Sequence, residues 1–190
     1  YAIYLAKKLS HSVDVLLTLY PHSNESHLLH HPNIKFTSLQ AESMKIPQLI
    51  EEIPSIDSKV EFEKLDTLIT RAKENYSIEG IVHGGILSKY QKDNFSLICE
   101  KNNLEIISPL WNTKPESYMK ELLEENFEYI ITSVSSDGLN DSWLGQIIDK
   151  NGLENLEKLQ KKFRFNLNFE GGEAETFVIN CPLFEKSLFI

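Results

Sequence analysis

The sequence predicts an α/β protein in which a doubly wound parallel sheet is followed by a smaller C-terminal α+β domain. Through the first 107 residues, short apolar runs of strand length alternate with segments whose apolar residues recur at helical spacing. The alternation breaks at the segment 108–111, Ser-Pro-Leu-Trp, so we expect domains over 1–110 and 111–190. A length of 190 residues fits one large domain or two small ones, and 41% hydrophobic residues suffice for a real core.

Local sequence patterns predict the helices and strands of the first domain. Apolar residues at helical spacing between Phe62 and Tyr76 predict a helix, and Asp57-Ser58 before them supplies a cap. The strands are short apolar runs rich in β-branched and leucine residues. In chain order we expect a helix over 1–9, a strand over 13–20, a polar loop over 21–33, a helix over 62–76, a strand over 78–82, a helix over 88–103 and a strand over 104–107.

The second domain is expected to contain two helices and two strands. Pro115 begins a helix that we expect to run to residue 126, and an apolar strand follows over 129–134. A further helix carries one apolar face, made by Leu153, Leu156, Leu159 and Phe163. After an acidic, glycine-containing segment, 177–179 reads as a last short strand. We expect these elements to form the smaller α+β domain.

Composition excludes several classes of protein. The 28 acidic residues outnumber the 19 Lys and Arg residues, and the resulting charge of −9 argues against nucleic acid and suits a cationic substrate. No apolar run reaches the length of a membrane span, so we expect no membrane partner. Cys99 and Cys181 form no Cys-x-x-Cys pair, which predicts reduced thiols in the cytoplasm. The motifs of dinucleotide oxidation and of serine hydrolysis are absent from the sequence.

The residue types of segment 170–178 are those of a functional site. It holds three carboxylates, two glycines and a hydroxyl: Glu170, Gly171, Gly172, Glu173, Glu175 and Thr176. Paired glycines permit a tight turn or a close approach of backbone to a ligand, and crowded carboxylates repel one another unless a cation shares their charge. We interpret the segment as the acceptor half of an active site. A glycine turn with solvated glutamates is the alternative.

A second candidate site lies where a predicted strand ends. His83, Gly84 and Gly85 follow the strand over 78–82, and ligands of open α/β sheets lie at the carboxyl ends of the strands. This turn therefore predicts a nucleotide pocket, with His83 as a contact. The alternative is that His83 is a structural side chain whose hydrogen bonds are satisfied within the fold.

Three other features have both a functional and a structural interpretation. Four histidines on the polar loop, at 22, 27, 30 and 31, have no accompanying cysteine or spaced carboxylates, so we predict no metal site. Trp111 and Trp143 are of a type that stacks on adenine or on a cation, but aromatic residues near a domain junction usually pack. The polar run 133–138 is either a site loop or a turn at the end of a strand.

Four segments together resemble the diphthine–ammonia ligase family. Segment 170–178, with Asn-Cys-Pro-Leu-Phe following at 180–184, is similar to the family's Gly-Glu-Gly-Gly-Glu-x-Glu-Thr signature and its downstream Pro-Leu-Phe. Segment 39–47, Leu-Gln-Ala-Glu-Ser-Met-Lys-Ile-Pro, resembles a run that leads from a helix into a strand. Segment 84–92, Gly-Gly-Ile-Leu-Ser-Lys-Tyr-Gln-Lys, matches a third motif, and Gly138-Leu139 with Trp143-Leu144-Gly145 matches a fourth. The four cover nearly the whole chain in order.

The resemblance implies an enzyme and a chemistry. It implies the HUP-like fold of the N-type ATP pyrophosphatases and the ATP-dependent amidation of diphthine, a modified histidine on elongation factor two, to diphthamide. ATP with Mg²⁺ activates the diphthine carboxylate as an acyl-adenylate, which ammonia attacks. Glu173 and Glu175 are then expected to be the catalytic residues, which bind the cationic acceptor or ammonium, with Glu170 as support and Thr176 as a hydrogen-bond partner. A glutamate whose pKa is raised by burial could also deprotonate ammonium. Gly171 and Gly172 would allow close backbone approach.

The resemblance also implies which residues bind the nucleotide, and the sequence departs from the family at two places. Gly84, Gly85, Ser88, Tyr90 and Gln91 are expected to line the nucleotide pocket. Lys92 stands where the family usually has arginine, which keeps the charge but loses the bidentate fork.

The family's opening Ser-Gly-Gly-Lys-Asp-Ser phosphate loop is not in the sequence, which begins at Tyr1 inside a predicted helix. We therefore expect a preceding strand and loop, without which ATP would bind poorly. Two other functions remain open: an ATP-dependent ligase that adenylates another carboxylic acid, and a nucleotide-binding regulatory protein without catalysis.

Overall fold

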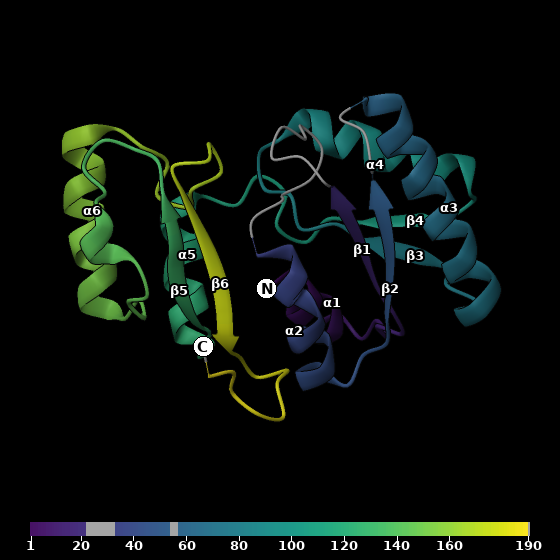
Figure 1. Cartoon of the computed structure of the whole chain (residues 1–190), viewed down its shortest axis with the longest axis horizontal. Coiled ribbons are helices and arrows are strands. Elements are labelled where there is room, and N and C mark those ends of the chain that lie inside the picture. Colours follow the sequence, from purple (N-terminus) through teal and green to yellow (C-terminus); the bar gives the residue numbers. More distant parts are fainter. Residues whose placement is uncertain (22–32, 54–56, 190) are drawn as a thin grey trace. The chain divides into compact units, whose positions relative to one another are not determined.

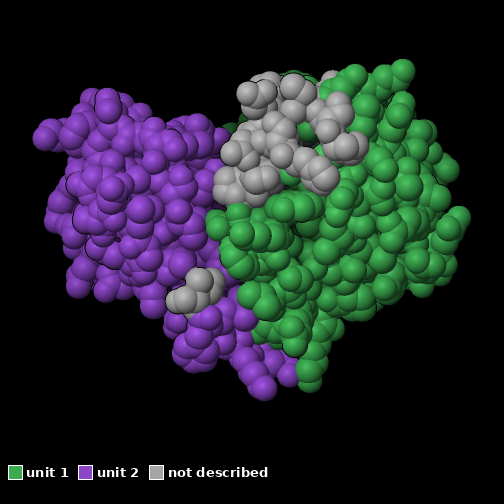
Figure 2. All heavy atoms as spheres, in the orientation of Figure 1, with its two compact units in different colours: residues 1–111 green, residues 112–190 purple. Residues whose placement is uncertain are grey.

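The computed structural model describes residues 1–21, 33–53 and 57–189. The chain divides into two compact units, Tyr1–Trp111 (unit 1) and Asn112–Ile190 (unit 2), which are coloured separately in Figure 2. Each unit has its own strands, helices and buried apolar residues.

Unit 1 alternates helices with parallel strands, so the predicted α/β class is confirmed (Figure 1). The helix that leads into a strand at segment 39–47 is also present. The described elements of unit 1 are α1 (Ala2–Lys8), β1 (Leu16–Pro21), η1 (Ile34–Phe36), α2 (Thr37–Met44), β2 (Gln48–Ile53), α3 (Ser58–Tyr76), β3 (Gly80–Val82), α4 (Lys89–Lys101) and β4 (Glu105–Ile107).

The strands of unit 1 form two parallel pairs. β1 pairs with β2 from Leu16 opposite Gln48 onward, and β3 pairs with β4 in a register that places Val82 opposite Ile107. Among the described residues, no strand pairing joins the two pairs into one sheet. The observed arrangement is therefore two parallel ribbons within one compact unit.

One apolar cluster binds the helices of unit 1 to both strand pairs. α3 contributes Leu65, Leu68 and Ile69, while Ile98 and Cys99 come from α4. Asp57 caps α3 as the sequence predicts, since its carboxylate accepts a hydrogen bond of 2.9 Å from the Lys59 amide. The cap fixes the start of α3, and the helical period then brings the apolar face onto the strands.

Unit 2 is built on one antiparallel pair of strands. Its described elements are α5 (Pro115–Glu124), β5 (Glu128–Val134), η2 (Asp141–Trp143), α6 (Lys150–Phe163) and β6 (Ala174–Asn180). β5 and β6 pair antiparallel with an irregularity between Ile131 and Ser133. The predicted apolar face of α6 is present, with Leu153 and Leu156 buried.

The last strand is longer than the sequence predicts. It begins at Ala174 rather than at residue 177, so Glu175 and Thr176 lie on β6 and not in the preceding loop. The reason is long-range backbone pairing, because Glu175 lies opposite Ser133 and Ala174 opposite Val134. Their strand partner is some 40 residues away in the chain, and local propensity does not reveal it.

Candidate functional site

The acidic loop, residues 166–173, turns twice before it enters β6. The Phe169 amide donates to the Asn166 carbonyl at 2.9 Å, and the Gly172 amide donates to the Phe169 carbonyl at 3.0 Å. Both Phe169, with φ +61°, and Gly172, with φ +78°, lie in the left-handed region. A Cβ at Gly172 would meet nothing within 4 Å, so the positive φ is the reason that glycine is favoured there.

Glu173 is the residue that holds this loop together. Its Oε1 accepts hydrogen bonds from the Asn166 backbone amide and from Asn166 Nδ2, both at 2.8 Å. Its Oε2 accepts from the Gly171 amide, also at 2.8 Å. One carboxylate thus joins the two ends of the segment 166–171 through three charge-assisted bonds.

Gly171 is required because Glu173 folds back so closely. A Cβ at Gly171 would lie 2.7 Å from Glu173 Oε1 and 3.0 Å from Asn166 Nδ2. The close approach expected at this glycine therefore exists, but it is made by a carboxylate of the same loop. Approach to a ligand at Gly171 and Gly172 stays a prediction.

Glu170 differs from Glu173 in its surroundings. It is exposed, and it lies between the buried Phe169 and the clamped amide of Gly171. Its charge reaches Tyr118 on α5: burial, with the negative charge of Glu170 adding to it, raises the pKa of Tyr118 to about 12. A carboxylate beside a desolvated phenol disfavours the phenolate.

Tyr129 lies deeper in the same unit. It is 3% exposed, and its hydroxyl has no hydrogen-bond partner within the part of the chain that the structure describes. Burial, with a contribution from Tyr118, raises the pKa of Tyr129 well above its usual range. Neither tyrosine carries a sequence signal for a site, because an aromatic residue on an apolar helix face or strand has the pattern of ordinary core.

The other residues of the acceptor segment lie on β6. Glu175 is half-buried and opposite Ser133, whereas Thr176 is exposed and opposite Ile131. The irregularity in β5 falls beside them, between Ile131 and Ser133. Of the three glutamates, only Glu173 has both oxygens engaged by the loop, and the acceptor roles of Glu175 and Thr176 stay predictions.

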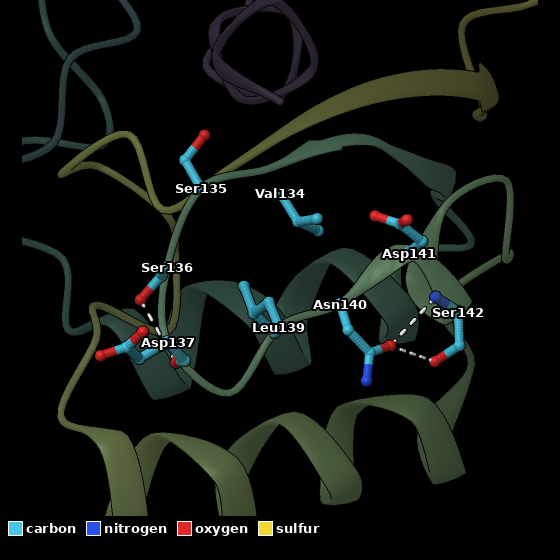
Figure 3. A pocket seen from close by; sticks show the side chains of 8 residues that line it. All are labelled: Val134, Ser135, Ser136, Asp137, Leu139, Asn140, Asp141 and Ser142. Carbon is cyan, nitrogen blue, oxygen red and sulfur yellow. Dashed lines mark hydrogen bonds between the residues drawn. The ribbon is translucent and has the colours of Figure 1, made fainter.

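The polar run after β5 borders an open depression of about 600 Å³. Figure 3 shows its lining, which includes Ser135, Ser136, Asp137 and Asp141. Asn140 is fixed in place, since its Oδ1 accepts a hydrogen bond of 3.0 Å from the Ser142 amide. The depression is polar and wide open, so its shape does not decide between a site loop and a turn at the end of a strand.

His83 lies at the carboxyl end of β3, as the sequence predicts. It is 7% exposed, its ring centroid is 4.4 Å from that of Phe95, and its Nδ1 has no partner among the described residues. A Cβ at Gly85 would lie 2.3 Å from His83 Cε1. Gly85 is therefore needed for the packing of the His83 ring. A contact between nucleotide and His83, Gly84 or Gly85 stays a prediction.

His83 gives unit 1 a pH dependence that can be measured. Burial lowers the pKa of His83 below its ordinary value of 6.5. As the pH falls below about 6.5, the unfolded chain takes up a proton that the folded chain refuses, so stability is lost toward acid by up to about 1.4 kcal/mol per pH unit. We expect His83→Gln to flatten this dependence between pH 7.5 and 5.5, measured as free energy of unfolding in urea. The exposed His11 is the control: His11→Gln should keep the slope, and equal slopes in wild type and His83→Gln would contradict the assignment.

A cavity of about 880 Å³ lies in unit 1 between the two strand pairs. Residues 16–19 of β1 and 80–82 of β3 line it, together with Leu65 of α3 and Phe95 of α4. His83 and Gly84 also border the cavity. The cavity separates the edge of β1 that faces away from β2 from the edge of β3 that faces away from β4, and both polar and apolar residues line it.

The remaining residues of the predicted nucleotide pocket begin α4. Ser88 is the N-cap of that helix, and its hydroxyl accepts a hydrogen bond of 3.3 Å from the Gln91 amide. Tyr90 is 48% exposed. Lys92 lies over the Trp111 ring, with Nζ 4.2 Å from the ring centroid. Ser88 and Lys92 therefore have structural partners, and Tyr90 is accessible to a ligand.

Within the described residues, no group of three or more His, Cys, Asp or Glu side chains is arranged to hold a metal ion. The four histidines of the polar loop lie outside the described residues. Over the same residues, no helix is both long enough and apolar enough to cross a membrane.

Comparison with known proteins identifies relatives of both units. The model of the diphthamide synthase N-terminal domain matches residues 1–106, and that of the diphthamide synthase C-terminal domain matches residues 114–190. Diphthine–ammonia ligase of Homo sapiens is 34% identical over 163 residues, which cover 80% of this chain and 61% of the relative. The Bos taurus enzyme of that name is 37% identical over 131 residues, 68% of this chain and 49% of the relative. The chain thus spans about half to three fifths of the length of these relatives.

Proposed function

The chain belongs to the diphthamide synthase family, and from this premise we propose that it takes part in the ATP-dependent amidation of diphthine on elongation factor two, which yields diphthamide. One observation carries the proposal. Both units match, in order, the two domains of the synthase, so the resemblance does not rest on a nucleotide-binding half alone. We propose that the protein acts in the cytoplasm, where its protein substrate works.

The reaction proceeds in two balanced steps. An oxygen of the diphthine carboxylate bonds to the α-phosphorus of ATP, and the bond from that phosphorus to the bridging oxygen breaks to release pyrophosphate. The nitrogen of ammonia then bonds to the acyl carbon, AMP leaves with the electron pair of the C–O bond, and the nitrogen loses a proton. ATP would enter as its magnesium complex, in which Mg²⁺ binds phosphate oxygens and screens their charge.

Unit 1 is assigned to the nucleotide in this proposal. Ligands of open α/β sheets lie at the carboxyl ends of parallel strands, and His83, Gly84 and Gly85 follow β3 at that edge. Ser88, Tyr90 and Gln91 continue the same turn into α4. Of these residues, Gly84 and Tyr90 are exposed.

We propose further that the strand pairs of unit 1 belong to one doubly wound sheet with the HUP-like fold of the N-type ATP pyrophosphatases. The support is the cavity between them. It separates the open edges of β1 and β3, and unpaired edges of parallel strands are rarely left uncovered in proteins. A further strand in this space would join the pairs in the order β2, β1, added strand, β3, β4.

Unit 2 is assigned to the acceptor. The acidic loop and β6 place Glu170, Glu173, Glu175 and Thr176 within one short stretch. Diphthine carries a trimethylammonium group, and carboxylates with nearby aromatic rings suit such a cation. Ammonium is the second cation that this loop is suited to meet.

The test is release of AMP and pyrophosphate by the protein that contains this chain. It is incubated with ATP, magnesium, ammonium and elongation factor two bearing diphthine, and a parallel reaction omits the factor. We expect AMP formation that depends on the factor, with a mass change of the factor that matches replacement of a carboxylate by an amide. AMP formed without the factor would indicate another acceptor, and absence of turnover would favour a nucleotide-binding protein without catalysis.

A further inference from the structure

Two polar side chains follow the carboxyl ends of the paired strands β3 and β4 (Figure 1). The two strands pair in parallel as far as Val82 opposite Ile107. The pairing continues beyond them, because the His83 amide donates a hydrogen bond of 2.8 Å to the Ile107 carbonyl. His83 and Ser108 are the residues that follow this last pair. Since paired strands lie about 4.8 Å apart, His83 and Ser108 are neighbours across the end of the ribbon.

Both side chains have a buried polar atom that lacks a hydrogen bond. His83 Nδ1 and Ser108 Oγ are buried, and neither has a partner among the residues that the structure describes. His83 as a whole is only 7% exposed. A buried polar atom without a partner costs free energy, and such atoms are rare in folded proteins. Two of them at neighbouring positions indicate a group that is bound by both.

The His83 ring is held in a fixed position beside a cavity. Its centroid lies 4.4 Å from that of Phe95, and a Cβ at Gly85 would lie 2.3 Å from its Cε1, so the ring packs closely on both sides. His83 also borders the cavity of unit 1. Ligands of open α/β sheets lie at the carboxyl ends of the strands. The unpartnered nitrogen therefore lies at the edge of unit 1 where a ligand is expected.

The chemistry of the two side chains selects an uncharged group. Burial lowers the pKa of His83 below its ordinary value of 6.5, so the imidazole is neutral near pH 7, as is the serine hydroxyl. One nitrogen of a neutral imidazole accepts a hydrogen bond, and a hydroxyl both donates and accepts. Such a pair fits a donor beside an acceptor and does not neutralise a phosphate. In a nucleotide, the ribose hydroxyls and the edge of adenine have this character.

We propose that His83 and Ser108 bind the uncharged nucleoside part of the nucleotide in unit 1, with His83 Nδ1 and Ser108 Oγ as the two hydrogen-bonding atoms. The proposal rests on the proposed function, which assigns the nucleotide to unit 1. It adds Ser108 to the residues that the sequence predicts for this pocket. It also gives His83 a contact with the nucleoside rather than with the phosphates.

The experiment measures nucleoside binding without turnover. Histidine rings are labelled with ¹⁵N in the protein that contains this chain, and the NMR signals of His83 are identified by their loss in His83→Gln. Adenosine or sodium pyrophosphate is added, with sodium chloride at equal ionic strength as the reference. We expect adenosine to shift the His83 signals in a saturable way, whereas pyrophosphate should give no more than the reference.

Two further probes identify the part of the nucleoside that is bound. They are 2′-deoxyadenosine and 3′-deoxyadenosine, each of which lacks one ribose hydroxyl. Loss of the His83 shift with either probe would identify the missing hydroxyl as the contact. A shift that both probes retain would identify the edge of adenine.

Variants at Ser108 separate binding from a structural role. Ser108→Ala should weaken adenosine binding about fivefold, as expected for the loss of one uncharged hydrogen bond. Because the hydroxyl has no partner among the described residues, the same change should not lower the free energy of unfolding without ligand. Ser38→Ala is the control, at an exposed serine on α2, and should leave the affinity for adenosine unchanged.

His83→Gln needs a second readout, because the variant lacks the NMR signal. Trp111 fluorescence in a Trp143→Phe background supplies it, since the Trp111 amide donates to the Ser108 carbonyl at 3.2 Å. We expect His83→Gln to weaken adenosine binding about fivefold. The control His11→Gln, at an exposed histidine of the same unit, should bind adenosine as the wild type does.

Three results would overturn the inference. The first is absence of a saturable shift with adenosine in the wild type, which would mean that another part of the protein satisfies His83. The second is a shift with pyrophosphate as large as that with adenosine. The third is wild-type affinity for adenosine in Ser108→Ala. None of these results depends on release of AMP. Adenosine binding without AMP formation would keep this inference and contradict the proposed function, so the two failures are distinguishable.

Discussion

Gly138→Ala is expected to lower the free energy of unfolding of unit 2 by about 3 kcal/mol. A Cβ at this position would lie 2.3 Å from Cδ2 and 2.6 Å from Cγ of Phe163. In addition, φ is +91°, where an L side chain is strained regardless of space. The measurement is urea denaturation followed by the fluorescence of Trp143, the only tryptophan of unit 2, in a Trp111→Phe background.

Two variants separate the parts of this effect. Gly145 has φ +74°, but a Cβ there would meet nothing within 4 Å, so Gly145→Ala should cost only the backbone strain of about 1 kcal/mol. Removing the ring with Phe163→Ala should reduce the additional cost of Gly138→Ala to a similar value, as a double-mutant cycle would report. Equal costs at Gly138 and Gly145 in the wild type would show that the ring moves aside freely.

Leu68→Ala is expected to destabilise unit 1 by about 3 kcal/mol, within the usual range of about 2–5 kcal/mol for a leucine removed from a core. Leu68 lies on α3, is 0% exposed, and belongs to the apolar cluster that ties α3 and α4 to both strand pairs. Its loss removes apolar burial and leaves a cavity that rigid neighbours cannot fill. Trp111 fluorescence in a Trp143→Phe background reports on unit 1.

The matched control is Leu97 on α4, which is 57% exposed. Leu97→Ala should change the free energy of unfolding by less than about 0.5 kcal/mol, because alanine is a good helix former and little burial is lost. A loss at Leu97 as large as that at Leu68 would contradict the position of the core. It would indicate instead that the exposed face of α4 is covered in solution.

Most helices followed from the sequence because their signals are local. The apolar period of α3 and the cap at Asp57 lie within one stretch of chain, and the structure confirms both. Strand limits were less accurate. β1 begins at Leu16 rather than at residue 13, and β6 begins at Ala174, because the length of a strand is fixed by the partner with which it exchanges hydrogen bonds.

The sequence marked the segment that we propose as the acceptor site, but it did not show which hydrogen bonds each glutamate makes. The crowding of Glu170, Glu173 and Glu175 beside two glycines marked the segment. That Glu173 bonds Asn166, seven residues earlier, depends on two turns through left-handed residues, one of them a phenylalanine. The electrostatic interaction between Glu170 and Tyr118 gave no sequence signal, because it depends on how α5 packs.

The sequence by itself determined the α/β class, the helical faces and the family, since each is written in residues close together or in motifs kept in order. The tertiary structure alone decided that the strands of unit 1 form two pairs with a cavity between them, that His83 is buried against Phe95, and that Glu173 is bound to its own loop while Glu170 is exposed. The physical reason is that burial, hydrogen-bond partners and pKa shifts are set by atoms distant in the chain, which only folding brings within a few ångströms.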